Sequence, residues 1–494
     1  MRRVIAGTSA QPVSAAEVAD RLRAAGLKVR VVGDPSIAVR GLTHDSRAVE
    51  PGQMFACLRG RSFDGHDYAT QTVADGATAL LVDHELAGVG ETAQLVVDDT
   101  RLAVGHASAI AWGDPAQHVT MIGITGTNGK TTTAQIVAAL LDAADRPTGI
   151  IGTLHGPRTT PEAPDLHAKL AEFVEQGKRA VVMEVSSHAL ALHRIDGTAF
   201  DLVAFTNFGH DHLDLHGSPE AYFRAKSALF TSTFAPLAVI NVDDTMGRLL
   251  ADTISDRSGD ETMGVTTIGH GDVAAAAVTA TEHTYEWNGR TVSVPLGGEF
   301  NVANSLMALS IIAALDVDVD AAVSGFESLA AVPGRFEVID TDQTRSRGIT
   351  VVVDYAHTPD GLERLLLAAR ALTDARVIAV FGCAGRRDLQ KRPIMGELAA
   401  RLADVAIATS DNPRGENPDA IINDVIEGVP EQYRARVVPL ADRRAAIRRA
   451  LEVAQPDDVV VIAGKGHEAT QDLGAETIDF DDRRVAREEL EDIS

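Results

Sequence analysis

The stretch VTMIGITGTNGKTTTAQIVAALLDAA, residues 119–144, decides the fold of the central part of this chain. Its first six residues form an apolar run, which is typical of a buried parallel strand. A glycine-rich turn follows, and then a segment with the composition of a helix. In this arrangement the free N–H groups of the helix point at one place, where the helix dipole favours an anion. The stretch therefore predicts a phosphate-binding loop on a parallel sheet.

The turn also supplies the side chains that phosphate binding needs. It comprises Gly126, Thr127, Asn128, Gly129, Lys130, Thr131 and Thr132. Lys130 offers a positive charge to phosphate oxygens, and Thr131 offers a hydroxyl to Mg²⁺. The spacing departs from the general GxxxxGK[ST] pattern, because the first glycine of that pattern would fall on Ile124. The alternative, a purely structural turn, leaves the Lys130–Thr131 pair at the helix start without explanation.

Other apolar runs extend the same pattern along the chain. Runs at residues 180–185, 202–205 and 237–242 alternate with helical segments, which is typical of a doubly wound sheet. After a Pro-Gly hinge at residues 332–335 the alternation starts again and predicts a Rossmann-like unit. We therefore expect an α/β protein of three domains, namely an N-terminal α/β domain at 1–113, a central P-loop ATPase-type sheet at 114–337 and a C-terminal domain at 338–494.

Composition narrows the class of protein. The 494 residues carry 45 Lys and Arg against 70 Asp and Glu, a formal net charge of −25, which argues against nucleic-acid binding as the main task. A hydrophobic content of 45% excludes disorder. No apolar run approaches the ~18 residues of a membrane span. The two cysteines, Cys57 and Cys383, form no disulfide framework or zinc pair. We expect a cytoplasmic protein without membrane insertion.

Glu184 is a candidate metal ligand. It ends the apolar run Ala-Val-Val-Met at 180–183, so it should lie at the carboxyl edge of a central strand, where α/β sheets bind ligands. A carboxylate at that edge can hold Mg²⁺ beside the loop phosphates. The alternative is a carboxylate that caps the following turn.

Lys226 stands where its helix needs an apolar residue. Ser218 and Pro219 predict a helix start, and Tyr222, Lys226 and Phe230 then fall on one stripe at helical spacing. On the residues alone, the simpler interpretation is a stem that lies along apolar surface with its ammonium in water. The other interpretation is a desolvated amine with a lowered pKa. Such an amine can react with CO₂ to give a carbamate, which binds Mg²⁺.

Two further groups have open interpretations. The segment 210–216 alternates histidine and aspartate and could be taken for a zinc site, but alternate residues rarely close a tetrahedron and no cysteine lies near it in sequence. Arg335, Asp354 and His357 lie at the hinge and at the first strand end of the third unit. They could form a ligand site, or only a loop ion pair and a turn histidine.

Motifs along nearly the whole chain resemble those of the Mur ligase family. Besides GTNGKT they are DSR (45–47), TTPEAPD (159–165), EVSSHAL (184–190), TN-x3-DHLD-x-H (206–216), AYF-x-AK (221–226), FN-x-AN (300–304), PGRFE (333–337), DYAHTPD (354–360), KRPIMG (391–396), DNPR (411–414) and GKGHE (464–468). The set is similar to family members that add the third residue of the peptidoglycan stem peptide. The resemblance implies a monomeric ATP-dependent ligase that joins meso-diaminopimelate to UDP-MurNAc-L-Ala-D-Glu through an acyl phosphate.

The resemblance also implies residue roles. Lys130, Lys226, Glu184 and His212 are the expected catalytic residues, and two Mg²⁺ ions would be held by Thr131, Glu184, His212 and the carbamate of Lys226. Besides the loop residues, Asn301, Arg335 and Asp354 would bind ATP, Asn301 through the adenine. The expected nucleotide-sugar contacts are Ser46, Arg61, Ser62, Phe63, Thr159, Thr160, Ser186 and Arg194. The expected amino-acid contacts are Arg387, Asp411, Asn412, Pro413, Arg414, Gly464 and Glu468.

The resemblance associates the DNPR motif with meso-diaminopimelate. The guanidinium of Arg414 could bind the distal carboxylate of this amino acid bidentately, whereas it would repel the distal ammonium of lysine. One departure stands nearby: the stretch GCAGRRD (382–388) has Ala384 and Arg386 where relatives usually have Gly and Asp. A ligase for another amino acid or pathway is therefore one alternative, and a P-loop ATPase without ligase activity is another.

Overall fold

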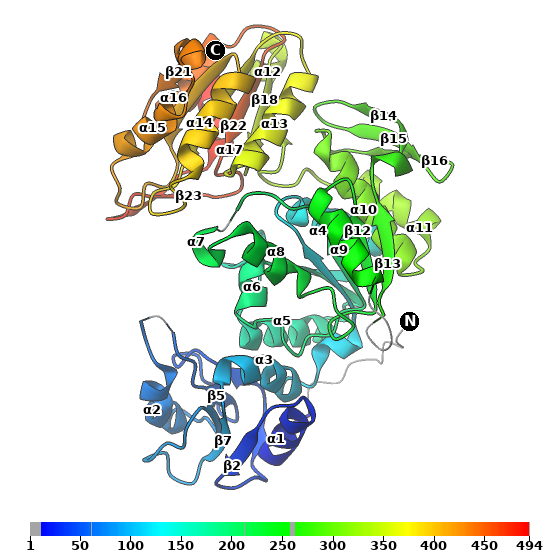
Figure 1. Ribbon diagram of the computed structural model, residues 1–494, viewed down its shortest axis with the longest axis vertical. Helices are drawn as coiled ribbons and strands as arrows, with labels where there is room; N and C mark the ends of the chain where they lie inside the picture. The colour runs from blue at the N-terminus through cyan, green and yellow to red at the C-terminus, as the bar shows by residue number, and fades with distance from the viewer. Residues whose placement is uncertain (1–10, 61, 212, 257–261, 494) are drawn as a thin grey trace.

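The computed structural model describes residues 11–60, 62–211, 213–256 and 262–493. Three units, each with a sheet of its own, follow one another along the long axis of the molecule (Figure 1). All three mix helices with largely parallel sheets. The predicted α/β class is therefore confirmed, while the predicted domain boundaries stay predictions.

The N-terminal unit is a small five-stranded sheet with helices packed against it. From one edge to the other its strands are β2 (Val29–Val32), β7 (Ala93–Val97), β6 (Ala79–Val82), β5 (Met54–Ala56) and β4 (Leu42–Thr43). All neighbours are parallel except β2 and β7. The apolar faces of α1 (Ala15–Ala24) and α3 (Thr100–Ala111) contribute to one core with strand residues such as Leu81.

The middle unit is a six-stranded parallel sheet. Its strands in order are β13 (Gly264–Ile268), β12 (Leu237–Asn241), β11 (Leu202–Phe205), β8 (Thr120–Thr125), β10 (Ala180–Glu184) and β9 (Thr148–Ile151). β8 begins and ends one residue later than the apolar run suggested, since Thr125 still pairs with Phe205. The chain order reverses beside β8, so the carboxyl end of this strand opens at the topological switch point of the sheet, where α/β proteins bind ligands.

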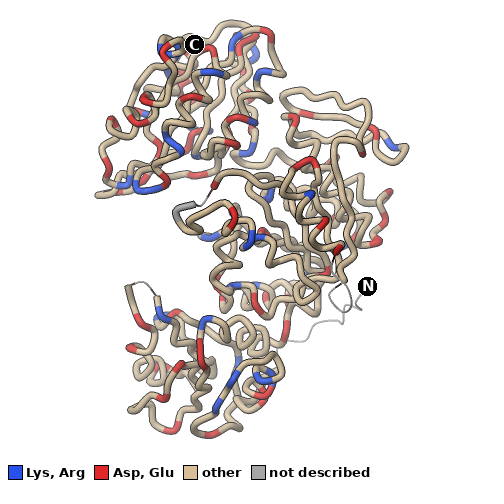
Figure 2. Tube along the Cα trace, viewed as in Figure 1, with Lys and Arg blue, Asp and Glu red and all other residues tan. Residues whose placement is uncertain are grey.

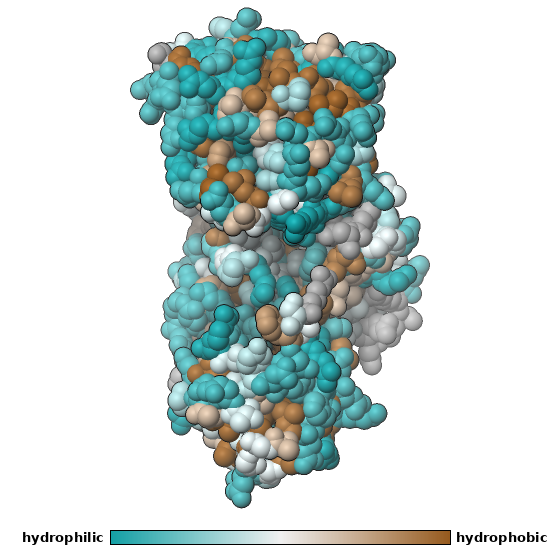
Figure 3. Space-filling model, turned by 90° about the vertical axis from the view of Figure 1, so that its left-hand side faces the viewer, coloured by the Kyte–Doolittle hydropathy of each residue, from teal (hydrophilic) through white to brown (hydrophobic). Residues whose placement is uncertain are grey.

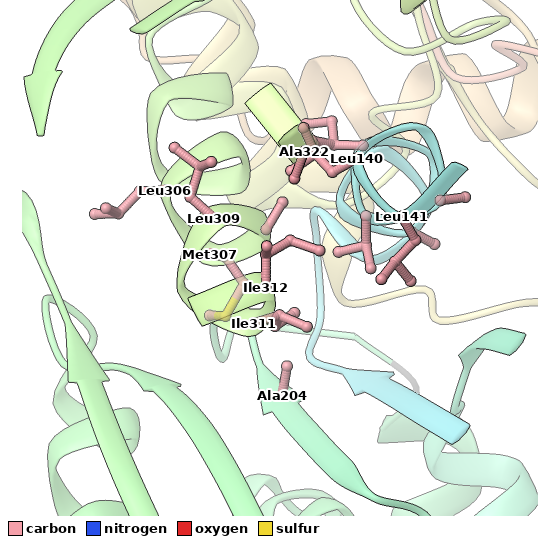
Figure 4. Close-up of a cluster of buried hydrophobic side chains, with 14 of the residues drawn as sticks. Leu140, Leu141, Ala204, Leu306, Met307, Leu309, Ile311, Ile312 and Ala322 are labelled. Carbon is pink, nitrogen blue, oxygen red and sulfur yellow. The ribbon is translucent and has the colours of Figure 1, made fainter. Parts of the chain in front are cut away.

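Helices cover both faces of this sheet. On one face, α4 (Lys130–Ala143) and α10 (Phe300–Ala314) pack on each other through residues such as Leu140 and Ile312 (Figure 4). The other face carries α5 (Ala163–Glu175) and the aromatic residues Phe205 and Phe230. A small antiparallel sheet packs on the same face as α4 and α10. It consists of β14 (Ala274–Val278), β15 (His283–Trp287) and β16 (Arg290–Val294), and residues of β15 and β16 belong to the core that those two helices form.

The C-terminal unit is a second six-stranded sheet. Its order is β17 (Glu337–Val338), β18 (Thr350–Asp354), β22 (Val459–Ala463), β19 (Val377–Cys383), β20 (Val405–Ser410) and β21 (Val437–Pro439). Only β17 is antiparallel to its neighbour, and it lies across the boundary predicted between residues 337 and 338. The helices of this unit include α12 (Asp342–Arg347), α13 (Pro359–Ala371), α14 (Lys391–Leu402), α15 (Pro418–Glu427), α16 (Arg443–Val453) and α17 (Asp482–Asp492).

The surface carries mixed charges. Acidic and basic residues are interspersed along all three units (Figure 2). The face seen in Figure 3 is mostly hydrophilic, with apolar residues in separate small groups. Within the described ranges, no helix combines the length and apolar character that crossing a bilayer requires.

Candidate active site

The phosphate-binding loop needs glycine at two positions. After β8 the backbone is left-handed at Gly126 (φ 145°) and Gly129 (φ 85°), and α4 begins at Lys130. A Cβ on Gly126 would lie 1.9 Å from the Thr206 hydroxyl, and one on Gly129 would lie 2.4 Å from the Asn304 side-chain oxygen. The loop is therefore a backbone cradle at a helix N-terminus, the arrangement that binds phosphate.

Lys130 is held inside this cradle. Its Nζ donates hydrogen bonds to the carbonyls of Gly126 and Thr127, both at 2.9 Å. Burial lowers the pKa of Lys130, and the neighbouring Glu184 carboxylate opposes that effect. The ammonium can turn from carbonyl partners to phosphate oxygens without leaving the loop.

Oxygen-bearing side chains gather beside the loop, and Glu184 lies at the end of its strand, as the sequence predicted. The Thr131 hydroxyl donates to Glu184 Oε2 at 2.9 Å, and the backbone N–H of Thr153 donates to Oε1 at 2.9 Å. Arg335 reaches Thr131 Oγ1 at 3.2 Å from the C-terminal side of the hinge. A hydroxyl and a carboxylate in contact are the ligand types that Mg²⁺ prefers, so these residues fit the ion that the loop motif implies.

Lys226 is buried, with 1% of its surface exposed, so the interpretation that put its ammonium in water is wrong. It lies on α8 (Pro219–Ser227). Its Nζ donates to the Gly126 carbonyl at 2.8 Å and lies 4.6 Å from the centre of the Tyr222 ring. Burial holds the pKa of Lys226 well below its usual value, and the charge of Lys130 lowers it further. The amine is thus desolvated, directed at the phosphate-binding loop and shifted toward its neutral form.

Asp354 lies where the C-terminal sheet meets the loop. Its carboxylate accepts the backbone N–H groups of Phe336 and Ala356, both at 2.7 Å. Burial raises the pKa of Asp354, and the Arg335 guanidinium acts in the opposite direction. That guanidinium lies 4.5 Å from the centre of the Tyr355 ring. Arg335 therefore lies between Asp354 and the phosphate-binding loop, and its contacts extend beyond the loop ion pair that was the alternative interpretation.

A cavity of about 720 Å³ runs between the middle and C-terminal units. The phosphate-binding loop, Glu184 and Arg335 are among its lining residues, and Phe300, Ala303, Met307, Leu365 and Ala368 supply apolar lining. Two of its lining residues have buried nitrogens without a hydrogen-bond partner, Asn128 Nδ2 and Arg335 Nε. The combination of a phosphate cradle, an apolar slot and unsatisfied donors fits a nucleoside triphosphate.

A second cavity, of about 230 Å³, adjoins the first on the C-terminal side. Its lining includes most of the predicted amino-acid contacts: Arg387, Asp411, Asn412, Arg414, Gly464 and Glu468. Gly464 is left-handed (φ 121°), and a Cβ there would lie 2.7 Å from Asp411 Oδ2. Carboxylates and guanidinium groups line the same small space, which suits a ligand with both amino and carboxylate groups.

Comparison with known proteins decides the family. The model of the Mur ligase family catalytic domain matches residues 38–109, that of the Mur ligase middle domain 124–312, and that of the Mur ligase glutamate ligase domain 334–466. UDP-N-acetylmuramoyl-L-alanyl-D-glutamate–2,6-diaminopimelate ligase of Streptomyces coelicolor is 42% identical over 509 aligned residues, covering 98% of this chain and 97% of the relative. The chain belongs to the Mur ligase family.

Other relatives agree with this assignment. The ligase of the same name from Thermosynechococcus vestitus is 42% identical over 472 residues, 92% of this chain and 93% of the relative. A solved structure with that name is 32% identical, with a TM-score of 0.65 over 98% of this chain and 99% of its own. MurF from Acinetobacter baumannii, at 19% identity and a TM-score of 0.68, covers 98% of this chain and shares the fold. The predicted family and enzyme class, an ATP-dependent amide ligase, are confirmed.

Some predicted contacts of this Mur ligase lie away from its cavities. Asn301 is buried and does not line the nucleotide cavity. Its side chain donates to the Gly297 carbonyl and accepts from Asn304, which does line the cavity. Within the described part of the N-terminal unit, Ser46, Ser62 and Phe63 line neither cavity, and Phe63 is 72% exposed. Arg61 and His212 lie outside the described residues.

The other nucleotide-sugar candidates lie beside Glu184. Thr159 and Ser186 line the large cavity. The Thr160 hydroxyl donates to the Glu184 carbonyl at 2.8 Å and accepts the Ser186 N–H at 3.0 Å. Arg194 donates to the Thr160 carbonyl at 3.3 Å. These residues form one hydrogen-bonded wall next to the predicted metal ligands.

The histidines of segment 210–216 that are described make separate contacts. His210 Nε2 lies 3.2 Å from Asp388, and His216 Nε2 lies 3.0 Å from the Ser187 hydroxyl. His357 Nδ1 lies 2.8 Å from the Tyr355 carbonyl, and its ring also lines both cavities. His357 is therefore a turn histidine that also lines both cavities, and its role in ligand binding stays a prediction.

Lys465 is a site residue that sequence reasoning missed. Its Nζ is fully buried and donates to Glu468 at 3.1 Å, to Asn412 Oδ1 at 3.4 Å and to the Thr470 carbonyl at 2.5 Å. It joins two of the predicted amino-acid contacts in one network. The signal was present in GKGHE, where a lysine directly follows the glycine at the end of a buried strand.

Proposed function

We propose that this Mur ligase joins meso-diaminopimelate to the D-Glu residue of UDP-MurNAc-L-Ala-D-Glu and converts ATP to ADP and phosphate. The names of the relatives support both substrates. The observation that carries the proposal is the second cavity, where Arg387 and Arg414 share a small space with Asp411 and Glu468. Meso-diaminopimelate has two ammonium and two carboxylate groups, and this lining offers a partner of opposite charge to each kind.

The reaction needs an activated carboxylate, because a free one would have to expel oxide. The γ-phosphoryl group of ATP passes to the γ-carboxylate of D-Glu, which gives ADP and an acyl phosphate. The amine of the amino acid, after losing its extra proton, attacks the acyl carbon. The tetrahedral intermediate then expels phosphate and leaves the amide. Lys130 lies where it can offset the negative charge of the transferring group.

Two Mg²⁺ ions complete this proposal. Bound Mg²⁺ supplies positive charge to the phosphoryl group during transfer. Thr131 and Glu184 would hold one ion, and His212 and the carbamate of Lys226 would hold the other. The neutral Lys226 amine forms an N–C bond to CO₂ and releases one proton to solvent, which turns a neutral group into an anion. The support for this step is the burial of Lys226, its lowered pKa and its contact with the loop.

The remaining assignments follow the three units. We assign the nucleotide sugar to Ser46, Arg61, Ser62 and Phe63 of the unit at 1–113 and to the wall beside Glu184, ATP to the unit at 114–337, and the amino acid to the unit at 338–494. We also assign a monomeric state, as the family resemblance implies. We place this monomer in the cytoplasm.

The test is product formation with a panel of amino acids. The protein is incubated with ATP, Mg²⁺, UDP-MurNAc-L-Ala-D-Glu and each amino acid in turn, while phosphate release is recorded and the product is weighed by mass spectrometry. The proposal expects a tripeptide product with meso-diaminopimelate that depends on all three substrates. Phosphate release without any peptide product would instead indicate an ATPase.

A further inference from the structure

The two arginines of the amino-acid cavity stand on loops that touch each other. Arg387 follows β19, and Arg414 follows β20. The Gly385 N–H donates to the Asn412 carbonyl at 2.9 Å, and a Cβ on Gly385 would lie 1.9 Å from the Pro413 carbonyl oxygen. The contact is backbone to backbone. A shift of either loop must therefore move the other or break this contact.

Each of these loops also contains a residue whose backbone is left-handed, a conformation that residues other than glycine rarely adopt. Arg386 has φ 53° and Arg414 has φ 52°. The left-handed conformation is unfavourable for a residue other than glycine, so the surrounding contacts must hold it in place. These contacts need to be strong, because they fix the direction in which the Arg387 and Arg414 side chains leave the backbone.

Glu416 is the group that joins these loops to the body of the C-terminal unit. Arg392, on the first turn of α14, is 1% exposed and donates to both Glu416 oxygens, at 2.8 and 2.9 Å. The same carboxylate accepts the backbone N–H of Arg386 at 3.0 Å. The hydrogen bonds from Arg392 lower the pKa of Glu416 to about 2. One charged carboxylate thus contacts the helix and both loops.

Arg392 has a second acidic partner that reaches neither loop. Asp424 lies on α15 and accepts from Arg392 Nη1 at 2.7 Å. Loss of the Glu416 charge therefore leaves the buried guanidinium with one carboxylate. Asp424 is therefore a matched control. It pairs with the same arginine atom, but none of its described hydrogen bonds reaches the loops that carry Arg387 and Arg414.

We propose that Glu416, held by Arg392, is a positioning residue for amino-acid choice. It fixes the two loops so that Arg387 and Arg414 converge on the distal carboxylate of the amino acid. Neither Glu416 nor Arg392 lines the amino-acid cavity, so both act through the arginines that do. The inference rests on the proposed function, since it concerns the choice between meso-diaminopimelate and lysine.

Steady-state kinetics of Glu416→Gln and Asp424→Asn test this role. For Glu416→Gln we expect the KM for meso-diaminopimelate to rise about tenfold, and the preference over L-lysine to fall by a similar factor, as loss of one charged hydrogen bond allows. The KM values for ATP and UDP-MurNAc-L-Ala-D-Glu should stay within about twofold, because their expected contacts lie on other loops. Asp424→Asn should leave all three KM values within that range.

The outcomes separate this inference from the proposed function. A wild-type enzyme that does not use meso-diaminopimelate overturns both. If the wild type uses meso-diaminopimelate, three results overturn the inference. Glu416→Gln has an unchanged KM for meso-diaminopimelate, its KM values for all three substrates rise together, or Asp424→Asn raises the KM for meso-diaminopimelate as much as Glu416→Gln does. If Glu416→Gln does not fold, Glu416→Asp takes its place, because it keeps the charge but shortens the side chain by one methylene group. The same rise in KM for meso-diaminopimelate is expected from Glu416→Asp, and an unchanged KM would refute the inference.

Discussion

At the scale of single residues, Lys226 best shows how position changes chemistry. An exposed lysine is a cation that does not react with CO₂ at neutral pH. On α8 this lysine occupies the apolar stripe, so burial and Lys130 lower its pKa and shift it toward the nucleophilic neutral amine. The hydrogen bond from its Nζ to the Gly126 carbonyl places that amine beside the loop. A carbamate formed there would present oxygens to a metal ion at the phosphates.

The first prediction follows from this chemistry. Lys226→Ala should lose at least about a hundredfold in kcat, which reflects a lost metal ligand, while its thermal unfolding stays close to that of wild type. Short carboxylic acids such as formate or acetate should restore part of the rate by occupying the place of the carbamate. Arg224→Ala is the matched control, because Arg224 is an exposed cation on the same helix. Wild-type turnover of Lys226→Ala in CO₂-depleted buffer would refute the carbamate.

At the scale of elements, a buried ion pair fixes the strand ends that carry the amino-acid residues. Arg443 on α16 and Asp482 on α17 are both fully buried, and Arg443 Nη2 lies 2.6 Å from the carboxylate. Arg443 also donates to the Ser410 carbonyl at the end of β20 and to the Ala463 carbonyl at the end of β22. One side chain thus joins two helices to the strands that lead into Asp411 and Gly464.

The second prediction concerns this pair. Arg443→Met should destabilise the C-terminal unit by about 3–5 kcal/mol, because it leaves the Asp482 charge buried without a partner. The double variant Arg443→Met/Asp482→Leu should recover part of that loss. Arg449→Met, at an exposed position on the same helix, should change stability by less than about 0.5 kcal/mol. Urea unfolding followed by circular dichroism measures all three. Equal midpoints for the variants at 443 and 449 would contradict this account.

The helices and strands were largely predictable from local sequence pattern, whereas the ion-pair partners of the buried cations were not. The strand-like runs at 202–205, 350–354 and 459–463 are strands with those bounds, and Glu184 does end its strand. Helical spacing placed Lys226 on the apolar stripe, but its burial went against the simpler interpretation of the residues alone, which put the ammonium in water. In contrast, Arg392, Arg443 and Lys465 look like ordinary surface cations in the sequence. Their roles depend on carboxylates 3 to 39 positions away, and the folded loops and helices of the C-terminal unit bring these partners within reach.

At the scale of the whole molecule, the middle and C-terminal units meet around one short loop. The backbone N–H of His210 donates to the Asp360 carboxylate, which lies in the first turn of α13. The neighbouring N–H of Gly209 donates to the Thr127 hydroxyl at 2.9 Å. Two hydrogen bonds, made by the neighbouring N–H groups of Gly209 and His210, therefore connect Asp360 to the phosphate-binding loop, although it belongs to the other unit. This contact can exist only while the two units are close together.

The third prediction tests this contact. Asp360→Ala should lower kcat/KM for ligation by about tenfold and increase the radius of gyration in small-angle scattering, since closure loses one charged hydrogen bond. Asp374→Ala is the control, because Asp374 is exposed beyond the end of α13. A fall in rate for Asp360→Ala without any change in dimensions would mean that Asp360 acts inside the site and not through closure.

The shape of the amino-acid cavity could be predicted only in part. DNPR pointed to Arg414, and the structure places it with Arg387 at the same cavity. The departure at Arg386 raised the question whether this extra arginine joins them. Its side chain is exposed and lies near Gly415, outside the cavity lining. That direction follows from the left-handed backbone at Arg386, which no local sequence pattern reveals.

The central claim is that Arg414 selects meso-diaminopimelate. The deciding measurement is kcat/KM for meso-diaminopimelate and L-lysine with wild type, Arg414→Ala and the neighbouring control Arg386→Ala. Wild type should prefer meso-diaminopimelate by roughly a thousandfold, because a site built for a carboxylate rejects a ligand that lacks it. Arg414→Ala should lose most of that preference through slower use of meso-diaminopimelate, with no matching gain for lysine, while Arg386→Ala keeps it. Equal use of both amino acids by wild type, or an unchanged preference in Arg414→Ala, would contradict the claim.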